Sequence, residues 1–178
     1  GGSNNPPEMT APFMDPVSGL YTSYADTVTA GDTVNFLLNI VDYNMFLNGN
    51  PQSVTIIASG SQFGLNFTDP DSGCVIPPCA TLTPALPVTY SIGGQIAFNW
   101  VTSCDHVTGI NAQCYNSSNT YNFVIKASDN YCPANASTLA TVSITVTGIQ
   151  PSVTVSGANA ICQGDTVILT ASGAQSYV

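Results

Sequence analysis

Positive charge is almost absent from this sequence. Its 178 residues include one lysine, Lys126, one histidine, His106, and no arginine, against ten acidic residues, so the formal net charge is −9. Binding to a nucleic-acid backbone requires clusters of Lys and Arg, and this composition excludes it. His106 is also the only imidazole, and no motif places a nucleophile and an orienting group around it. We therefore predict no enzyme, and we expect His106 to be a polar loop residue.

Long hydrophobic runs and helical periodicity are missing as well. No apolar run reaches the roughly 18 residues of a transmembrane helix, and the first residues, GGS, are not a signal peptide. No window has apolar residues at i, i+3, i+4 and i+7 between helix caps. Charged residues make up only 6%, whereas 44% are hydrophobic, which is enough for a packed core. We expect an all-β chain that is an internal part of a longer secreted protein.

Strict alternation of apolar and polar residues is what the sequence does have. Residues 121–130 (YNFVIKASDN) and 140–146 (ATVSITV) alternate with a period of two, which predicts two half-buried strands. Strands that bury one face need a second sheet to cover it, so a β-sandwich is predicted. Its expected core consists of the inward-facing residues of these and the upstream strands: Val34, Phe36, Leu38, Ile40, Val54, Ile56, Phe98, Trp100, Phe123, Ile125, Val142 and Ile144.

The chain divides into three parts. Residues 1–19 are rich in Pro, Asn and Gly and are predicted to be a linker that becomes an edge strand. Residues 20–148 hold the strands of the sandwich. The pattern then restarts, since GDTV at residues 31–34 recurs at residues 164–167 and opens a strand each time. We therefore expect residues 149–178 to begin a second repeat in a tandem array.

The cysteines indicate an oxidising compartment. Their spacing fits zinc poorly, so disulfides are expected. We favour Cys74 with Cys79 and Cys104 with Cys132, although a strand of about 26 Å would separate the second pair if its members lie at opposite ends. The rival pairing is Cys104 with Cys114. Otherwise Cys114 has no obvious partner, and we expect Cys162 to pair beyond Val178. The six residues are Cys74, Cys79, Cys104, Cys114, Cys132 and Cys162.

Several framework motifs resemble a known family. They are NPP at residues 5–7, AGDTVNF at 30–36, FNWVTSC at 98–104, YNFVIKASDNYCP at 121–133 and ICQGDTVILTASG at 161–173. Together they resemble the cadherin-like and immunoglobulin-like repeats of very large Bacteroidota surface proteins. Such proteins are typically exported by the type IX secretion system, and many are associated with gliding motility or adhesion. A true antibody-type domain is not indicated, because Cys74, Trp100 and Cys132 lack that family's spacing.

The resemblance implies an immunoglobulin-like or cadherin-like β-sandwich with a structural and adhesive role. The chain would be a non-catalytic stalk module of a bacterial cell-surface adhesin or filament. Its partners would be neighbouring repeats, the type IX secretion machinery and an unknown surface or glycan ligand. One alternative is a spacer or accessory domain of a secreted type IX enzyme. Another is a calcium-dependent glycan-binding domain.

Two further kinds of binding site have weak candidates. Asp69 and Asp71 resemble the start of a calcium loop, and Asp42 and Asp129 lie at predicted strand ends, where cadherin-like domains hold calcium. No segment supplies the six to eight oxygens that calcium needs, and turn formation is the alternative role. Calcium apart, no cofactor is expected. Five aromatic residues are candidates for a glycan-binding patch, although packing explains them more simply: Tyr21, Tyr24, Tyr43, Phe46 and Tyr90.

Three threonines are candidates for O-glycosylation. Thr27, Thr33 and Thr166 each stand between Asp and Val, the short pattern at which the resembling Bacteroidota proteins are O-glycosylated. Strand alternation turns the following valines inward at Val34 and Val167, so the threonines should face solvent. The alternative is that Asp-Thr serves only as turn and strand-entry chemistry.

Overall fold

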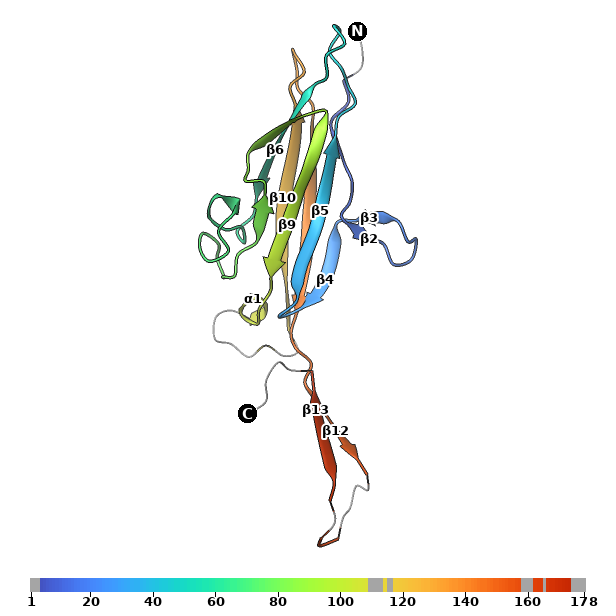
Figure 1. Cartoon of the computed structure of the whole chain (residues 1–178), viewed down its shortest axis with the longest axis vertical. Coiled ribbons are helices and arrows are strands. Elements are labelled where there is room, and N and C mark those ends of the chain that lie inside the picture. Colours follow the sequence, from blue (N-terminus) through green and yellow to red (C-terminus); the bar gives the residue numbers. More distant parts are fainter. Residues whose placement is uncertain (1–3, 109–113, 115–116, 158–161, 165, 174–178) are drawn as a thin grey trace.

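Two β-sheets packed face to face make up most of the molecule (Figure 1). The computed structural model describes residues 4–108, 114, 117–157, 162–164 and 166–173. The first sheet has the order β1 (Glu8–Met9), β5 (Thr33–Val41), β9 (Gly93–Val101) and β7 (Thr81–Thr83). The second has the order β4 (Ala25–Thr29), β11 (Ser137–Thr147), β10 (Ser118–Asp129), β6 (Ser53–Ser59) and β8 (Val88–Ser91).

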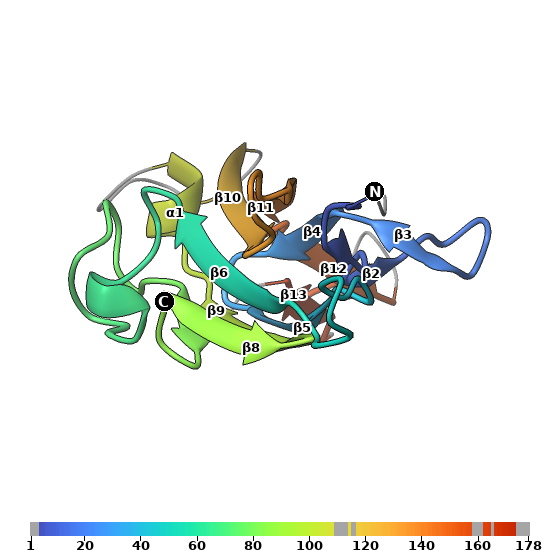
Figure 2. The same ribbon diagram turned by 90° about the horizontal axis from the view of Figure 1, so that it is seen from above.

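The remaining elements are short and lie outside the two sheets. Hairpin β2 (Phe13–Met14) and β3 (Tyr21–Ser23) projects from one side of the sandwich, and the loops around the 3₁₀ turn η1 (Leu65–Phe67) project from the other (Figure 2). Helix α1 (Asp105–Thr108) follows β9. No helix among the described residues is long and apolar enough to span a membrane. The last hairpin consists of β12 (Ser152–Ser156) and β13 (Ile168–Ser172).

The predicted all-β sandwich is confirmed. Its N-terminal segment gives β1 to one sheet and β4 to the other, and the strand order of the two sheets is that of an immunoglobulin-type sandwich. All pairings within the two sheets are antiparallel except one, in which β4 runs parallel to β11. The cadherin-like and tandem character of the fold stays a prediction.

The recurring GDTV motif has a clear backbone role in its first copy. Gly31 has a φ of +102°, which suits glycine, and it turns the chain from β4 in one sheet to β5 in the other. The turn is closed by Asp32, whose carboxylate accepts the N–H of Thr29 at 2.9 Å. Gly164, at the same place in the second copy, has a φ of +99°. The two copies therefore share a left-handed glycine before a strand.

The predicted core is confirmed, except that one of its residues is only half-buried. Eleven of the twelve expected residues are buried, and Phe36 is half-buried because it lies where β1 no longer covers β5. Its ring stacks on Phe98, with centroids 4.5 Å apart, and Phe13 of β2 meets it edge-on. Phe63, which follows no period in the sequence, also enters the core and contacts Phe98 and Phe123.

The part expected to begin a second repeat forms the hairpin β12–β13 at the end of the sandwich opposite the N-terminal segment (Figure 1). All ten of its strand residues are exposed. One face carries Val153, Val155 and Leu169. Val155 pairs with Leu169 across the two strands, and Val153 lies two residues before Val155 on β12. A lone two-stranded hairpin is marginal in water, so this face needs a cover to be stable.

Replacement of Trp100 by alanine tests the core. The side chain is fully buried, so Trp100→Ala should lower the free energy of unfolding by about 3 to 5 kcal/mol through lost burial and an unfilled cavity. Urea denaturation followed by far-ultraviolet circular dichroism measures this. Leu139→Ala is the control, since Leu139 is 63% exposed on β11 and should change stability little. Equal destabilisation by the two substitutions would contradict the strand register.

Candidate functional site

His106, expected in a polar loop, is completely buried instead. It lies in α1, and its imidazole packs edge-on against Trp100 and Tyr121, with ring centroids 4.9 and 5.8 Å away. The expectation was wrong because the polar sequence around His106 has no period that would reveal an inward-facing residue. The side chain is therefore part of the core and not of a solvent-exposed site.

The hydrogen bonds of His106 define its protonation state. Nδ1 accepts the backbone N–H of Ser103 at 2.8 Å, so Nδ1 carries no proton and the proton lies on Nε2. Nε2 faces the carbonyl oxygens of Ile76 at 2.9 Å and Pro78 at 3.1 Å. Burial lowers the pKa of His106 below its usual value of 6.5, although the carbonyls and the nearby Asp105 act in the opposite direction. The folded protein thus favours the neutral ring.

A serine lies close to this histidine, but the geometry does not form a catalytic pair. Ser103 Oγ is 3.0 Å from Nδ1 of His106. However, the ring nitrogen has a single lone pair, and the N–H of Ser103 already occupies it. The other ring nitrogen faces backbone carbonyls and not an orienting carboxylate. The pair therefore supports no hydrolytic chemistry.

The buried cluster around His106 holds a loop in place. Gln62 donates through Nε2 to the carbonyls of Ile76 and Pro78, and the indole N–H of Trp100 donates to Pro78 at 2.9 Å. Three side chains from three segments thus converge on the loop closed by the disulfide of Cys74 and Cys79. Buried donors of this kind need partners, and the loop carbonyls supply them, whereas Oε1 of Gln62 has no partner among the described residues. We assign the cluster a structural role.

A second polar cluster lies at the pole where the N-terminal segment meets the sandwich. Asp129, at the end of β10, is 4% exposed and accepts three hydrogen bonds. Its Oδ1 accepts the N–H groups of Tyr131 and Ala136, and its Oδ2 accepts Nδ2 of Asn4 at 2.8 Å. Oδ1 of Asn4 then accepts Nε2 of Gln52 at 3.0 Å. This chain of donors fixes the orientation of both amides.

Two oxygens at this pole have no hydrogen-bond partner among the described residues. Gln52 is 1% exposed, and because its Nε2 faces Asn4, its Oε1 is left bare. Asp42, just past the end of β5, is 2% exposed; its Oδ1 accepts two bonds from Asn44, while Oδ2 is bare. Buried unpaired acceptors are costly, so they call for a water or a hard cation. No cluster of three or more His, Cys, Asp or Glu residues able to hold a metal occurs in the described part of the chain.

The other calcium candidates, Asp69 and Asp71, lie in an exposed turn. Asp69 accepts the N–H of Asp71 at 2.8 Å and the hydroxyl of Ser72 at 2.7 Å. These hydrogen bonds lower the pKa of the Asp69 carboxyl, and the bond from the Ser72 hydroxyl has the largest effect. Both oxygens of Asp69 therefore serve its own turn, which is the alternative role stated above. The unpaired buried oxygens at the entry pole, where the N-terminal segment meets the sandwich, are those of Asp42 and Gln52, and a third, Oε1 of Gln62, lies in the cluster around His106. Burial of these residues could not be read from sequence.

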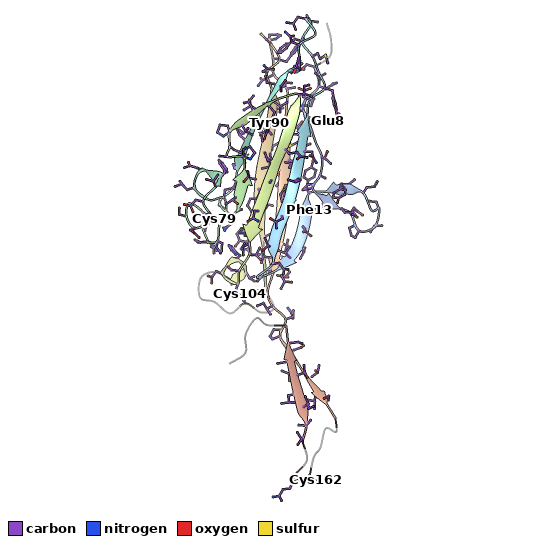
Figure 3. All side chains as sticks on the ribbon, in the orientation of Figure 1. Glu8, Phe13, Cys79, Tyr90, Cys104 and Cys162 are labelled. Atoms are coloured by element: carbon purple, nitrogen blue, oxygen red, sulfur yellow. A yellow bond between two sulfur atoms is a disulfide. The ribbon has the colours of Figure 1, made fainter. Side chains whose placement is uncertain are left out.

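Two disulfides occur among the described residues. Cys74 is bonded to Cys79, as predicted. Cys104 is bonded to Cys114, so the favoured pairing of Cys104 with Cys132 is wrong and the rival pairing holds. The reason is the length of β10, which runs from Ser118 to Asp129 and carries the exposed Cys132 to the opposite pole. Cys104 lies at the pole where the chain leaves the sandwich, here called the exit pole, and Cys162 lies beyond this pole on the last hairpin (Figure 3).

The five aromatic residues proposed as a glycan patch lie on four different segments. Tyr21 is on the side hairpin β2–β3, whereas Tyr43 and Phe46 are on the loop after β5. Tyr24 is half-buried, which raises its pKa, and its hydroxyl donates to the carbonyl of Met9. Tyr90 of β8 covers Gly94, where an added Cβ would lie 2.5 Å from the ring. Three of the five rings, those of Tyr24, Phe46 and Tyr90, are therefore half-buried against the fold, whereas Tyr21 and Tyr43 are exposed.

The three candidate glycosylation sites are all exposed. Thr27 is on β4, Thr33 begins β5, and Thr166 precedes β13. Val34 is buried and Val167 is half-buried, which confirms the expected inward and outward alternation. Asp165, which belongs to the third pattern, lies outside the described residues. Modification itself stays a prediction.

The exit of the chain from the sandwich is restrained, which sequence reasoning missed. Gly148 donates its N–H to the carbonyl of Ser117 at 2.7 Å, and Ile149 donates to the carbonyl of Cys114 at 2.8 Å. A Cβ on Gly148 would lie 2.6 Å from that second carbonyl, so glycine is needed for this approach. Ile149 also packs against the core. The disulfide-bonded segment before β10 thus clamps the start of the connection to β12.

Mapping of the disulfides tests these assignments. We expect chymotryptic digestion without reduction to yield a peptide linking Cys104 with Cys114 and one containing bonded Cys74 and Cys79. Because Cys132 is exposed and outside both bonds, iodoacetamide should alkylate it in the folded, unreduced protein. A linked peptide containing Cys104 and Cys132 would overturn the pairing.

The neutral state of His106 predicts a pH effect on stability. Since folding lowers the pKa of His106, the unfolded chain binds a proton more readily below pH 6.5. Stability should therefore be full above that pH and fall as the pH drops towards the folded pKa, by at most about 1.4 kcal/mol per pH unit for one proton. Urea midpoints between pH 7.5 and 5.5 measure this. His106→Gln should be less stable but should lose most of this pH dependence; an unchanged slope would refute the assignment.

The comparisons with known proteins do not show a family. No protein-family model matches the chain, and no curated protein matches its sequence. Among solved structures, the CooA pilin subunit from enterotoxigenic Escherichia coli is similar over 81% of this chain and 99% of that chain. The sequence identity is 10% and the TM-score is 0.41, a likeness too distant to carry an argument about function.

Proposed function

We propose that this chain is a non-catalytic structural module of an extracellular stalk, a β-sandwich that adds length and display to a large bacterial surface protein. The observation that carries the proposal is the path of the chain. The N-terminal segment is bound at one pole through Asn4 and Asp129, and the chain leaves at the opposite pole after Thr147 (Figure 1). When the chain enters a module at one pole and leaves it at the opposite pole, the module adds the length of its long axis to the polypeptide.

The restrained exit supports the same function. A flexible linker would let successive segments fold back on one another, whereas hydrogen bonds from Gly148 and Ile149 to the body of the sandwich limit the directions available to the chain. Two disulfides and a surface of Ser, Thr and Asn suit an oxidising, extracellular place of work. The hairpin after this junction would then begin the neighbouring repeat.

The resemblance to Bacteroidota repeats supplies the finer part of the proposal. It favours a cell-surface adhesin exported by the type IX secretion machinery, with neighbouring repeats as the nearest partners. Glycans on Thr27, Thr33 and Thr166 would add a solvated coat to a surface with few charges. A spacer in a secreted enzyme would use the same geometry, since the path of the chain and its restrained exit do not depend on whether the spacer is joined to an adhesive or a catalytic domain.

Labelling of intact cells tests the proposed function. In the cells that produce the protein, antibodies against the purified chain should bind without permeabilisation, because a stalk module lies outside the cell. Antibodies against a cytoplasmic protein provide the control and should label only lysed cells. Glycopeptide mass spectrometry of the same native material reports on Thr27, Thr33 and Thr166. Labelling confined to lysed cells would contradict the proposal.

A cation-dependent role is the second candidate, and the bare oxygens of Asp42 and Gln52 favour it. A calcium ion at this pole would take Oδ2 of Asp42 and Oε1 of Gln52 as ligands, with water completing its shell. Such an ion would stiffen the attachment of the N-terminal segment, because Gln52 also holds Asn4.

Thermal melting in calcium or chelator tests this second role. For the affinity usual in extracellular modules, 10 mM calcium should stabilise the fold by about 1.4 to 2.7 kcal/mol relative to EDTA. Asp42→Asn should abolish the difference, whereas Asp71→Asn, at an exposed turn position, should preserve it. Identical melting in calcium and EDTA would exclude a bound cation, and water would then be the partner of the two unpaired oxygens.

A further inference from the structure

In the second sheet, a strand from the beginning of the sandwich sequence pairs with the strand at its end. β4 and β11 lie side by side and parallel, with Ala25 to Thr29 in register with Ser143 to Thr147. The ladder is closed at one end by the N–H of Ser143 bonded to the carbonyl of Tyr24 and at the other by the N–H of Ala30 bonded to the carbonyl of Thr147, each at 2.8 Å. β4 is the first strand of its sheet along the chain, and β11 is the last.

The direction of these strands decides how tension acts on them. Pulling on the N-terminal side draws β4 towards the entry pole, and pulling on the C-terminal side draws β11 towards the exit pole (Figure 1). Because the strands are parallel, these forces slide one strand along the other. All the hydrogen bonds of the ladder must then stretch together, whereas strands peeled apart from one end lose their bonds singly.

From this arrangement we propose that the β4–β11 pair is a tensile clamp, so that the sandwich resists being pulled apart by its ends. The backbone ladder before β4 is shorter, since β1 pairs with β5 at Glu8 and Met9 and one further bond runs from the N–H of Thr10 to the carbonyl of Asn39. Side-chain bonds such as that of Asn4 to Asp129 add to it. On its other side β11 pairs with β10 from Ser137 to Thr147. β4–β11 is thus the shorter of the two ladders that hold β11, and it is where the load is opposed.

Side chains reinforce the ladder on its inner face. Val146 and Ile144 of β11 are fully buried, and Val28 of β4 packs against the core. The hydroxyl of Thr147 also donates to the carbonyl of Val28 at 3.0 Å. Sliding β4 by one residue would turn its inward residues outward, so the core opposes the same motion as the hydrogen bonds. This property belongs to the isolated chain and goes beyond the proposed stalk function.

A matched pair of proline variants tests the clamp. The bonded carbonyl of Tyr24 and N–H of Ala30 show that even-numbered residues of β4 face β11, so the N–H of Asp26 points to the ladder and that of Thr27 points away. Asp26→Pro removes a ladder bond and Thr27→Pro does not. Both residues are exposed, and both substitutions remove the bond between the Thr27 N–H and the Asp26 carboxylate.

The measurement is the unfolding force of the full chain held between identical marker domains at its two ends. Asp26→Pro should unfold about fivefold faster than Thr27→Pro at the same force, the effect of one net hydrogen bond. Circular dichroism establishes that both variants are folded. Equal unfolding rates in two folded variants would overturn the proposal, while surface labelling of cells would be unaffected.

Pulling geometry gives a test that needs no proline. With Cys162 replaced by serine, a handle can be attached to the exposed thiol of Cys132. Cys132 follows the end of β10 at Asp129, which is bonded to Asn4, so the handle lies at the same pole as the N-terminal segment. Pulling between this handle and the N-terminus peels the strands from one end, so the Cys162→Ser chain should unfold at a lower force than when it is pulled by its two ends. The same force in both geometries would rule out the clamp, even where Asp26→Pro does not fold.

Discussion

Contact between the aromatic rings of the two sheets is the interaction on which the rest of the structure depends. Phe98 and Trp100 of β9 meet Phe123 of β10 edge-on, with ring centroids 4.9 and 5.6 Å apart. Such pairs bury much apolar area and prefer this geometry. Burial of an indole also requires a partner for its N–H, and the carbonyl of Pro78 supplies it. The core thereby determines where the disulfide-bonded loop lies.

The same requirement for partners explains why the single histidine is buried and neutral. The loop carbonyls of Ile76 and Pro78 need donors, and Nε2 of His106 is one that can be buried without charge. A lysine at this place would bring a charge into the core. In this cluster amides, an indole and one imidazole thus fill roles that ions fill in other proteins, whereas the buried carboxylates of Asp42 and Asp129 lie at the opposite pole.

Alternation predicted the long strands, and eleven of the twelve residues that it placed in the core are buried, because strand burial depends on positions two residues apart. It could not predict His106 or Phe63, which lie in segments without a period and are placed by contacts distant in sequence. The pairing of Cys104 failed for a related reason: the choice depends on which pole each turn occupies, and β10 carries Cys132 away. Likewise, the bare oxygens of Asp42 and Gln52 result from a chain of donors that begins at Asn4.

Division of the N-terminal segment between the two sheets connects the fold to its proposed role. After β1 the chain leaves the first sheet through the hairpin β2–β3, and β4 then joins the second sheet beside β11. Had β4 run antiparallel to β11, it would have had to begin at the exit pole, which would place both connections of this strand pair at one end. The parallel pairing is therefore what separates entry from exit, and a module can lengthen a stalk and oppose tension along it for this one reason.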